Sequence, residues 1–581
     1  MRGQFHAGSV LRGGGVAVFL VILFTLWGPR GAFADAAIPG DATSVFRLSR
    51  RGSKVILEGA DGALLSLLPT LVVRHNGRSW TARFVLTPPS HATSRSLAKG
   101  GRALLLRATA RGPTLKAILE ISRAGHDPEL FFRVTRRYLR GVRVQREALR
   151  FHVPSGVVLR AVDRMYRLRR VRAPLLAGVA SPVVVLFERG LARLAWFGST
   201  SLSHARLRPR RRLLEMELDD RRSHPLRAFA RCQRHLRRYP PPRRDLGATP
   251  RRRGERVVAT GRFVLGPRIL VAAQRYPDGY AAALSFTDHA DQSSTDRLEA
   301  FAFGATGALA RGEVGPQRPG FVNRGLRYTK TVFLRRSHGY EAQFDSPRYR
   351  SVLAALARRG TEIGVHSPSG ARDRPALARS LLGPFVSAYH GQNWIDHQPY
   401  TNCEALSMKG LDPHSPWFML GELARVGIRY VWAAPDVRLA PRTLNMLRGS
   451  NPALHRPAIF THKRLRYGAK RFVAFRSVML FQPRRRLLRR FSPVALSRLI
   501  ADRGLLIGHV YFDSCCAHGR FRVRSLLRRC AAGGYALRPD VDALFQRLAV
   551  LQAQKALWVT GVEALARHLL DALAVSVRYR R

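Results

Sequence analysis

The segment Tyr276–Asp291, YPDGYAAALSFTDHAD, decides how this chain is interpreted. Its apolar run is typical of a buried strand, and the run ends abruptly in an Asp-His-x-Asp cluster, Asp288 to Asp291. Carboxylate and imidazole groups gathered where a strand ends are suited to a divalent-metal or acid–base site. We therefore predict a functional site at the carboxyl end of this strand.

A second segment, Gly360–Ser369 (GTEIGVHSPS), has the same design. A short apolar strand ends in His366 and is followed by Ser and Pro residues that favour a turn. Two strands that each deliver a polar group at the carboxyl end are typical of the active sites of α/β barrels.

Together the two segments resemble the first two motifs of the polysaccharide deacetylases, the NodB-like carbohydrate esterases. The first family motif is a strand ending in Thr-Phe-Asp-Asp-Gly, and the second is Gly-His-Glu-Ile-Gly-x-His-Ser-x-x-His. The resemblance covers about residues 265–575. It implies a distorted (β/α) barrel in which a metal ion, with zinc as the expected one, helps to remove acetyl groups from sugars.

The first motif can be aligned in two registers. In one, Asp288 is the metal ligand and Thr287 stands where the family has its catalytic base. In the other, Asp288 is the base and His289 is the metal ligand, a residue type that binds zinc well. Asp291 could also supply the missing carboxylate.

The second motif keeps His366 as a metal ligand but has Gly370 where the family has its second His. The segment Tyr389–Gln398 offers replacements, of which Asp396 and His397 are preferred and His390 comes next. The expected substrate-binding residues in the same segment are Tyr389, His390 and Trp394, because aromatic rings can stack on sugar faces.

A later apolar strand, Gly504–Phe512, resembles the family strand that carries a general acid, which makes His509 the third expected catalytic residue beside Asp288 and Asp291. The alternative for each His is a structural role, in which the ring is hydrogen-bonded inside the core. Two losses, at the base position and at the second His, are also those expected of a deacetylase domain that has become inactive.

The N-terminus has the pattern of a secretory signal peptide: Arg2 and Arg12, an apolar run from Gly15 to Trp27, and Ala-x-Ala cleavage signals near Ala34. We expect cleavage to leave a periplasmic or extracellular chain without a stable transmembrane segment. Five cysteines allow one or two disulfides with one thiol left over, and we expect no disulfide framework.

The chain has 100 Lys and Arg residues against 37 acidic ones, a formal net charge of +63. A compositional bias toward Arg explains the preference for Arg over Lys but not the shortage of acidic residues. We expect a basic surface that contacts polysaccharide or another anionic glycan of the cell envelope. Nucleic acid is not expected, because the chain carries an export signal and no nucleic-acid-binding motif.

The pattern along the chain predicts an α+β multidomain protein. Residues 37–235 show about ten short apolar or alternating runs separated by turn signals, which favours a β-sandwich. Strands alternate with helical patterns after that, in keeping with a barrel. The predicted division is residues 1–36 signal peptide, 37–235 β-sandwich, 236–256 Pro- and Arg-rich linker, and 257–581 deacetylase-like (β/α) barrel.

The sequence therefore predicts an exported, metal-dependent deacetylase of polysaccharide or cell-wall glycan. The alternative is a catalytically inactive relative that binds glycan in polysaccharide export or envelope organisation. A third, weaker interpretation is a glycan hydrolase or lyase whose carboxylates act without metal.

Overall fold

The computed structural model of the chain describes most of the segments with recognisable strand or helix patterns. The described residues are 20–23, 47–51, 54–59, 61–87, 102–124, 129–162, 168–172, 175–177, 184–190, 192–197, 205–218, 249–266, 270–273, 275–291, 293–310, 320–335, 343–369, 375–396, 402–434, 436–437, 439, 443–447, 458–480, 484–514, 526–531 and 533–574.

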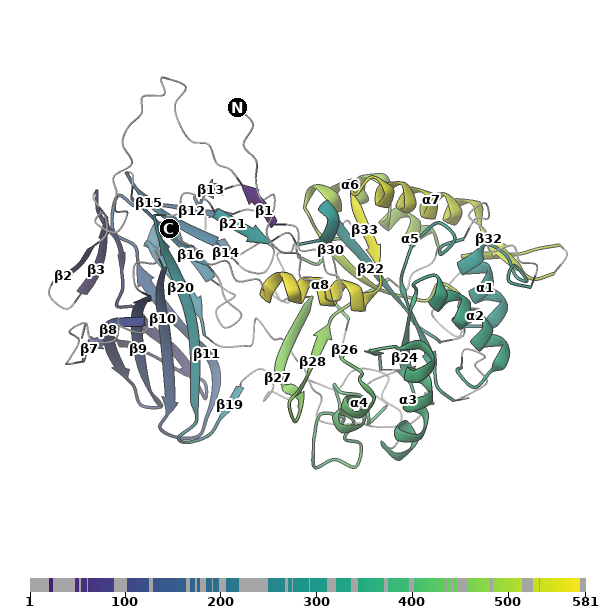
Figure 1. Cartoon of the computed structure of the whole chain (residues 1–581), viewed down its shortest axis with the longest axis horizontal. Helices are drawn as coiled ribbons and strands as arrows, with labels where there is room; N and C mark the ends of the chain where they lie inside the picture. Colours follow the sequence, from purple (N-terminus) through teal and green to yellow (C-terminus); the bar gives the residue numbers. More distant parts are fainter. Residues whose placement is uncertain are drawn as a thin grey trace, which may run out of the picture.

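The first part of the chain forms antiparallel sheets, drawn on the left in Figure 1. One has nine strands in the order β13 (Leu168–Arg170), β12 (Val158–Val162), β15 (Val184–Arg189), β16 (Ala192–Phe197), β20 (Arg256–Leu265), β10 (Glu129–Tyr138), β9 (Leu115–Ala124), β8 (Arg102–Arg111) and β7 (Val85–Leu86). Another has seven: β14 (Leu175–Ala177), β17 (Ala205–Arg208), β18 (Leu213–Glu217), β11 (Val142–His152), β5 (Thr70–His75) and β6 (Arg78–Arg83), with β19 (Thr249–Arg251) also on β11. A smaller three-stranded sheet contains β2 (Arg47–Arg51), β3 (Lys54–Gly59) and β4 (Gly62–Ser66).

The two larger sheets share one hydrophobic core. Phe151 of β11 meets Phe132 of β10 and Phe263 of β20, with ring centroids 6.2 and 5.9 Å apart. Strand β20 thus belongs to the nine-stranded sheet although it follows the predicted linker, much of which lies outside the described residues. The sharp in–out alternation along β10 buries one face of the strand in this core.

The second part is built on a mostly parallel sheet with helices around it, drawn on the right in Figure 1. Its strand order is β27 (Ile459–Tyr467), β28 (Lys470–Phe475), β26 (Tyr430–Trp432), β25 (Asn393–Trp394), β24 (Glu362–Ser367), β23 (Thr329–Phe333), β22 (Ala282–Asp288), β30 (Leu505–Val510) and β29 (Val478–Met479). Its helices are α1 (Thr295–Phe303), α2 (Pro347–Arg358), α3 (Pro375–Tyr389), α4 (Leu420–Val426), α5 (Arg484–Arg490), α6 (Pro493–Ala501), α7 (Pro539–Ala553) and α8 (Val562–Ala574).

Strand β22 lies at a fork in this sheet. One side of β22 pairs with β30 along its length. The other side pairs with β33 (Leu557–Thr560) at the beginning of β22 and with β23 at its end. Every residue of β22 is buried, as expected of a central strand of small and apolar residues. The fork places the first turn of α8, which follows β33, beside the beginnings of β23, β24 and β25.

The predicted fold class, an N-terminal β-sandwich followed by a NodB-like (β/α) barrel, is wrong. In the described residues the strand path has two ends, at β27, which runs antiparallel to β28, and at β29, and no pairing between named strands joins them. An isolated parallel bridge links Val478 of β29 to Val437, after β26. The alternation of strands and helices predicted a barrel, but local alternation cannot show that β22 divides one edge between two partners.

Other expectations concern the termini and cysteines. Leu20–Leu23, inside the predicted signal peptide, is strand β1 and pairs with β21 (Leu270–Ala273); the rest of residues 1–36 lies outside the described residues, and the export signal stays a prediction. None of the described helices combines the length and the apolar character needed to cross a membrane. Cys403 is disulfide-bonded, and Cys530 is a free, partly buried thiol.

Candidate metal and acid–base site

Three histidines meet at the carboxyl ends of β22, β24 and β30. His289 follows the last residue of β22, while His366 and His509 lie near the ends of their strands. The ring centroid of His289 is 4.8 Å from that of His366 and 3.5 Å from that of His509, on which it stacks with an interplanar angle of 13°. Because β22 is flanked by β23 and β30, residues about 75 and 220 positions apart are brought to one edge of the sheet.

His289, Asp291 and His366 form the group suited to a metal ion. One ligand atom from each lies within 4.8 Å of the others, and Nε2 of His366 is 3.0 Å from Oδ2 of Asp291. Both imidazoles are buried, whereas Asp291 is partly exposed and leaves the group reachable from solvent. Two imidazole nitrogens and one carboxylate oxygen are a donor set that zinc and similar first-row ions accept, so these residues fit the predicted metal.

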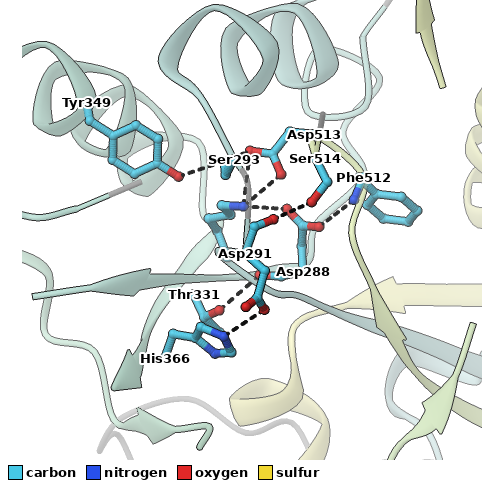
Figure 2. A network of polar contacts seen from close by, with 10 residues as sticks. Asp288, Asp291, Ser293, Thr331, Tyr349, His366, Phe512, Asp513 and Ser514 are labelled. Carbon is cyan, nitrogen blue, oxygen red and sulfur yellow. Dashed lines mark hydrogen bonds and ion pairs between the residues drawn. The ribbon is translucent and has the colours of Figure 1, made fainter. Parts of the chain in front are cut away.

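Asp288 has different partners. Its Oδ2 accepts a hydrogen bond from the ammonium of Lys330 at 2.7 Å, and its Oδ1 accepts one from the backbone N–H of Phe512 at 2.6 Å (Figure 2). Burial raises the pKa of Asp288, and the Lys330 charge and the Phe512 N–H oppose this shift. The carboxylates of Asp288 and Asp513 raise the pKa of Lys330 against the effect of burial, so the ammonium stays charged.

A buried relay positions His509. Its Nδ1 lies 2.8 Å from Oδ2 of Asp436, and Oδ1 of Asp436 accepts a hydrogen bond from Ser477 at 2.6 Å. Ser477 in turn accepts one from the indole N–H of Trp432 at 2.7 Å. A carboxylate at Nδ1 holds the proton on that nitrogen, which leaves Nε2 of His509 as the atom that can accept or deliver a proton. This Nε2 is buried and has no hydrogen-bond partner among the described residues.

Two aromatic side chains flank the stacked imidazoles. Trp432 approaches both rings edge-on at about 6 Å and is almost wholly buried. Tyr511 lies 5.6 Å from the ring of His289 and 5.1 Å from that of His509, and it is partly exposed. Tyr511 is therefore the aromatic residue that a ligand at this edge could touch.

The structure brings together only some of the predicted site residues. His289, Asp291, His366 and His509 meet, and Asp288 lies directly beneath them in its ion pair with Lys330. The preferred replacement ligand Asp396 is buried and accepts hydrogen bonds from the indole N–H of Trp394 and the backbone N–H of Leu406. Burial raises the pKa of Asp396 to about 7. The other preferred replacement, His397, lies outside the described residues.

The predicted substrate-binding residues lie apart from this group. Trp394 is fully buried, so its ring faces no solvent on which a sugar could stack. Tyr389 ends α3 and packs on Phe344 and Phe385, and His390 is exposed just before β25 begins. Both therefore lie toward the amino ends of the strands, away from the edge where the three histidines meet.

Sequence reasoning missed Lys330, Asp436 and Asp513. Lys330 stands in β23, whose sequence TKTVF is only partly apolar, so nothing local shows that this charge is buried and needs an ionic partner. Asp513 lies in the turn after β30, four residues after His509. A carboxylate so soon after a candidate catalytic residue could have been recognised as a further site residue. Asp436 lies in a segment without a strand or helix pattern, and nothing local marks it.

No protein-family model matches the chain, and a search of curated proteins finds no match. Among solved structures, the GH36 α-galactosidase AgaA from Geobacillus stearothermophilus matches with a TM-score of 0.31 and 10% identity, over 87% of this chain and 74% of that one. The α-galactosidase from Lactobacillus brevis matches with a TM-score of 0.27 and 10% identity, over 64% and 61%. A putative aldose 1-epimerase from Klebsiella pneumoniae matches with a TM-score of 0.21 and 7% identity, over 35% and 63%.

These findings correct the assignment to the polysaccharide deacetylases, which is wrong. No family model supports it, and the matched structures named above are galactosidases and an epimerase rather than deacetylases. The motif matches rested on short strand-end patterns, whose chemistry had already changed at Gly370 and around Asp288. With TM-scores this low, the likenesses themselves establish neither the fold nor the substrate of this chain.

Proposed function

We propose that the chain is a carbohydrate-active protein, and specifically a metal-dependent hydrolase with its site at the carboxyl edge of the parallel sheet. The observation that carries the hydrolase proposal is the convergence of His289, Asp291 and His366 beside the buried His509–Asp436 pair. A metal-ligand group and an oriented imidazole are the two parts that such a hydrolase needs.

Each residue has a defined task in this proposal. His289, Asp291 and His366 would hold the ion, which when bound polarises a water molecule and the substrate oxygen. Asp436 keeps the proton of His509 on Nδ1, so Nε2 exchanges protons with the substrate. Lys330 engages Asp288 on one oxygen and the Phe512 N–H engages the other, so Asp288 supports the segment rather than binding substrate.

The proposed substrate class is carbohydrate, in keeping with the α-galactosidases and the putative aldose 1-epimerase named above. Tyr511, partly exposed beside the imidazoles, offers the amphipathic ring that a sugar face can stack on. The formal charge of +63 favours an anionic glycan over a neutral one. Export to an oxidising compartment is part of the proposal, and the disulfide at Cys403 is in keeping with it.

The proposal is tested on the purified chain by zinc titration followed by assays with acylated sugars, glycosides and anionic polysaccharides. Stoichiometric zinc together with chelator-sensitive hydrolysis of any sugar substrate supports it, and the bond that is cleaved defines the reaction. Zinc binding and polysaccharide affinity without turnover would mean a glycan-binding protein instead. Hydrolysis that survives chelation would contradict the role of the metal.

Replacing Asp436 with Asn is expected to lower kcat while zinc affinity stays unchanged. The amide can donate a hydrogen bond to Nδ1 and so favours the wrong tautomer of His509, and proton transfer by a positioned side chain contributes about 10²–10⁴-fold to rates. We expect a loss of up to about 10²-fold, measured as initial rates with saturating zinc. Wild-type kcat in this variant would remove His509 from the reaction.

A further inference from the structure

The short segment from Asp288 to Ser293 carries two of the three proposed metal-ligand residues, and both its ends are tied to Asp513, one directly and the other through Lys330. At its beginning, Asp288 is bound by Lys330, whose ammonium also lies 2.9 and 3.1 Å from the two oxygens of Asp513. At its end, the hydroxyl of Ser293 donates a hydrogen bond to Oδ2 of Asp513 (Figure 2). Asp513 therefore spans the segment that presents His289 and Asp291.

The middle of the segment is held from the same side. Ser293 and Ser514 form an isolated antiparallel bridge, and the hydroxyl of Ser514 donates to the backbone carbonyl of Asp291. Because Ser514 directly follows Asp513, the turn after β30 fixes Asp291 through its backbone and Asp288 through Lys330. Tyr349 of α2 adds a contact of 3.2 Å between its hydroxyl and that of Ser293.

Lys330, Asp288 and Asp513 are all completely buried. Charges without access to water are tolerated only when they are paired and hydrogen-bonded. Removing one partner leaves the other charges buried without a counterion, which destabilises the folded state. The ammonium has three protons, and the carboxylate oxygens around it define its direction. The result is a rigid connection among β22, β23 and the turn after β30, directly beneath the ligand group.

We propose that Lys330 and Asp513 are positioning residues that set the place of Asp291 relative to His366 and thereby the metal affinity of the site. This inference rests on the proposed function, since it assigns these residues to the same metal site. It goes beyond that function because neither residue reaches the ligand group itself. A purely structural ion pair would affect only the stability of the fold.

The test compares zinc dissociation constants of the full chain, measured by competition titration at a temperature where every variant is folded. Lys330→Met should weaken zinc binding about 10- to 100-fold, the effect typical of residues that orient metal ligands. Ser293→Ala removes one hydroxyl and leaves Lys330 paired with its carboxylates. It should weaken zinc binding by up to about tenfold. Leu544→Ala is the control, because it opens a cavity in the core under α7, a helix that carries none of these residues.

The control separates the two roles. Leu544→Ala should lower the unfolding temperature, with a cost of about 2–5 kcal/mol, and leave the zinc dissociation constant unchanged. Wild-type zinc affinity in both Lys330→Met and Ser293→Ala would overturn the inference. If Lys330→Met does not fold, Ser293→Ala decides the matter alone.

A second readout separates this inference from the proposed function. If the wild-type chain binds no zinc, the proposed function fails, and metal-free crystal structures of wild type and Ser293→Ala then test the positioning role. The separation between Oδ2 of Asp291 and Nε2 of His366, 3.0 Å here, should lengthen in the variant. An unchanged separation would overturn the inference.

Discussion

Replacing His366 with Ala is expected to abolish measurable zinc binding while the chain stays folded. The imidazole of His366 is 3.0 Å from Oδ2 of Asp291 and its centroid is 4.8 Å from that of His289, so its loss leaves two ligand side chains where three converged. Loss of a residue that only orients a ligand costs about 10- to 100-fold in affinity, so loss of a ligand should cost more than about 100-fold. Elemental analysis and zinc titration of the purified variant measure the effect, with circular dichroism to confirm the fold.

His390→Ala is the matched control for this experiment. It also removes one imidazole, but from an exposed position just before β25, away from the carboxyl edge of the sheet. We expect His390→Ala to bind zinc as the wild type does. Zinc retained at full affinity by His366→Ala would remove His366 from the site and would leave the proposed hydrolase without its metal.

Replacing Glu563 with Gln is expected to stabilise the protein above pH 8. Burial, reinforced by the nearby carboxylate of Glu362, raises the pKa of Glu563 from 4.5 to about 8. A folded-state pKa above the unfolded value means that the folded state binds the proton more tightly. Its contribution to stability is therefore complete below about pH 4.5 and is lost as the pH rises through 8.

The neutral amide of Gln removes this dependence and can still accept the hydrogen bonds that Gln392 and Asn393 donate to Oε1 of Glu563. With about 1.4 kcal/mol for each pKa unit, the gain above pH 8 should be on the order of a few kcal/mol. Urea unfolding at pH 5 and pH 9 measures the free energy of unfolding at each pH. Asp571→Asn, about two turns further along α8, is the control, and equal pH dependence in wild type and Glu563→Gln would contradict the prediction.

The sequence was sufficient to place the three histidines at strand ends, because each follows an apolar run whose carboxyl end it marks. It was not sufficient to choose the ligands. Asp288 and Asp291 are equivalent in the local pattern, and only the burial of Lys330 on the neighbouring strand assigns Asp288 to an ion pair and leaves Asp291 for the proposed metal. Asp396 was preferred for its chemistry, but the indole of Trp394 and the backbone of Leu406 take up its oxygens.

The sheet topology was harder to predict for a related reason. Strand β22 has the composition of a central strand, which the local pattern shows correctly, but its two longer pairings are with β30 and β33, more than 200 positions later. Local periodicity carries no information about which distant strand occupies an edge. The closed barrel was therefore predicted from the family resemblance. The forked sheet of the structure shows that this prediction is wrong.

The fork at β22 also bears on the order in which the chain can acquire its structure during synthesis. Strand β22, which His289 directly follows, meets β23 through only two residue pairs, and its longer pairings are made with β30 and β33. Because contacts between distant residues form slowly, we expect β22 to stay incomplete until β30 and β33 have been synthesised. We therefore expect the segment that carries His289 and Asp291 to be among the last parts of this sheet to become rigid.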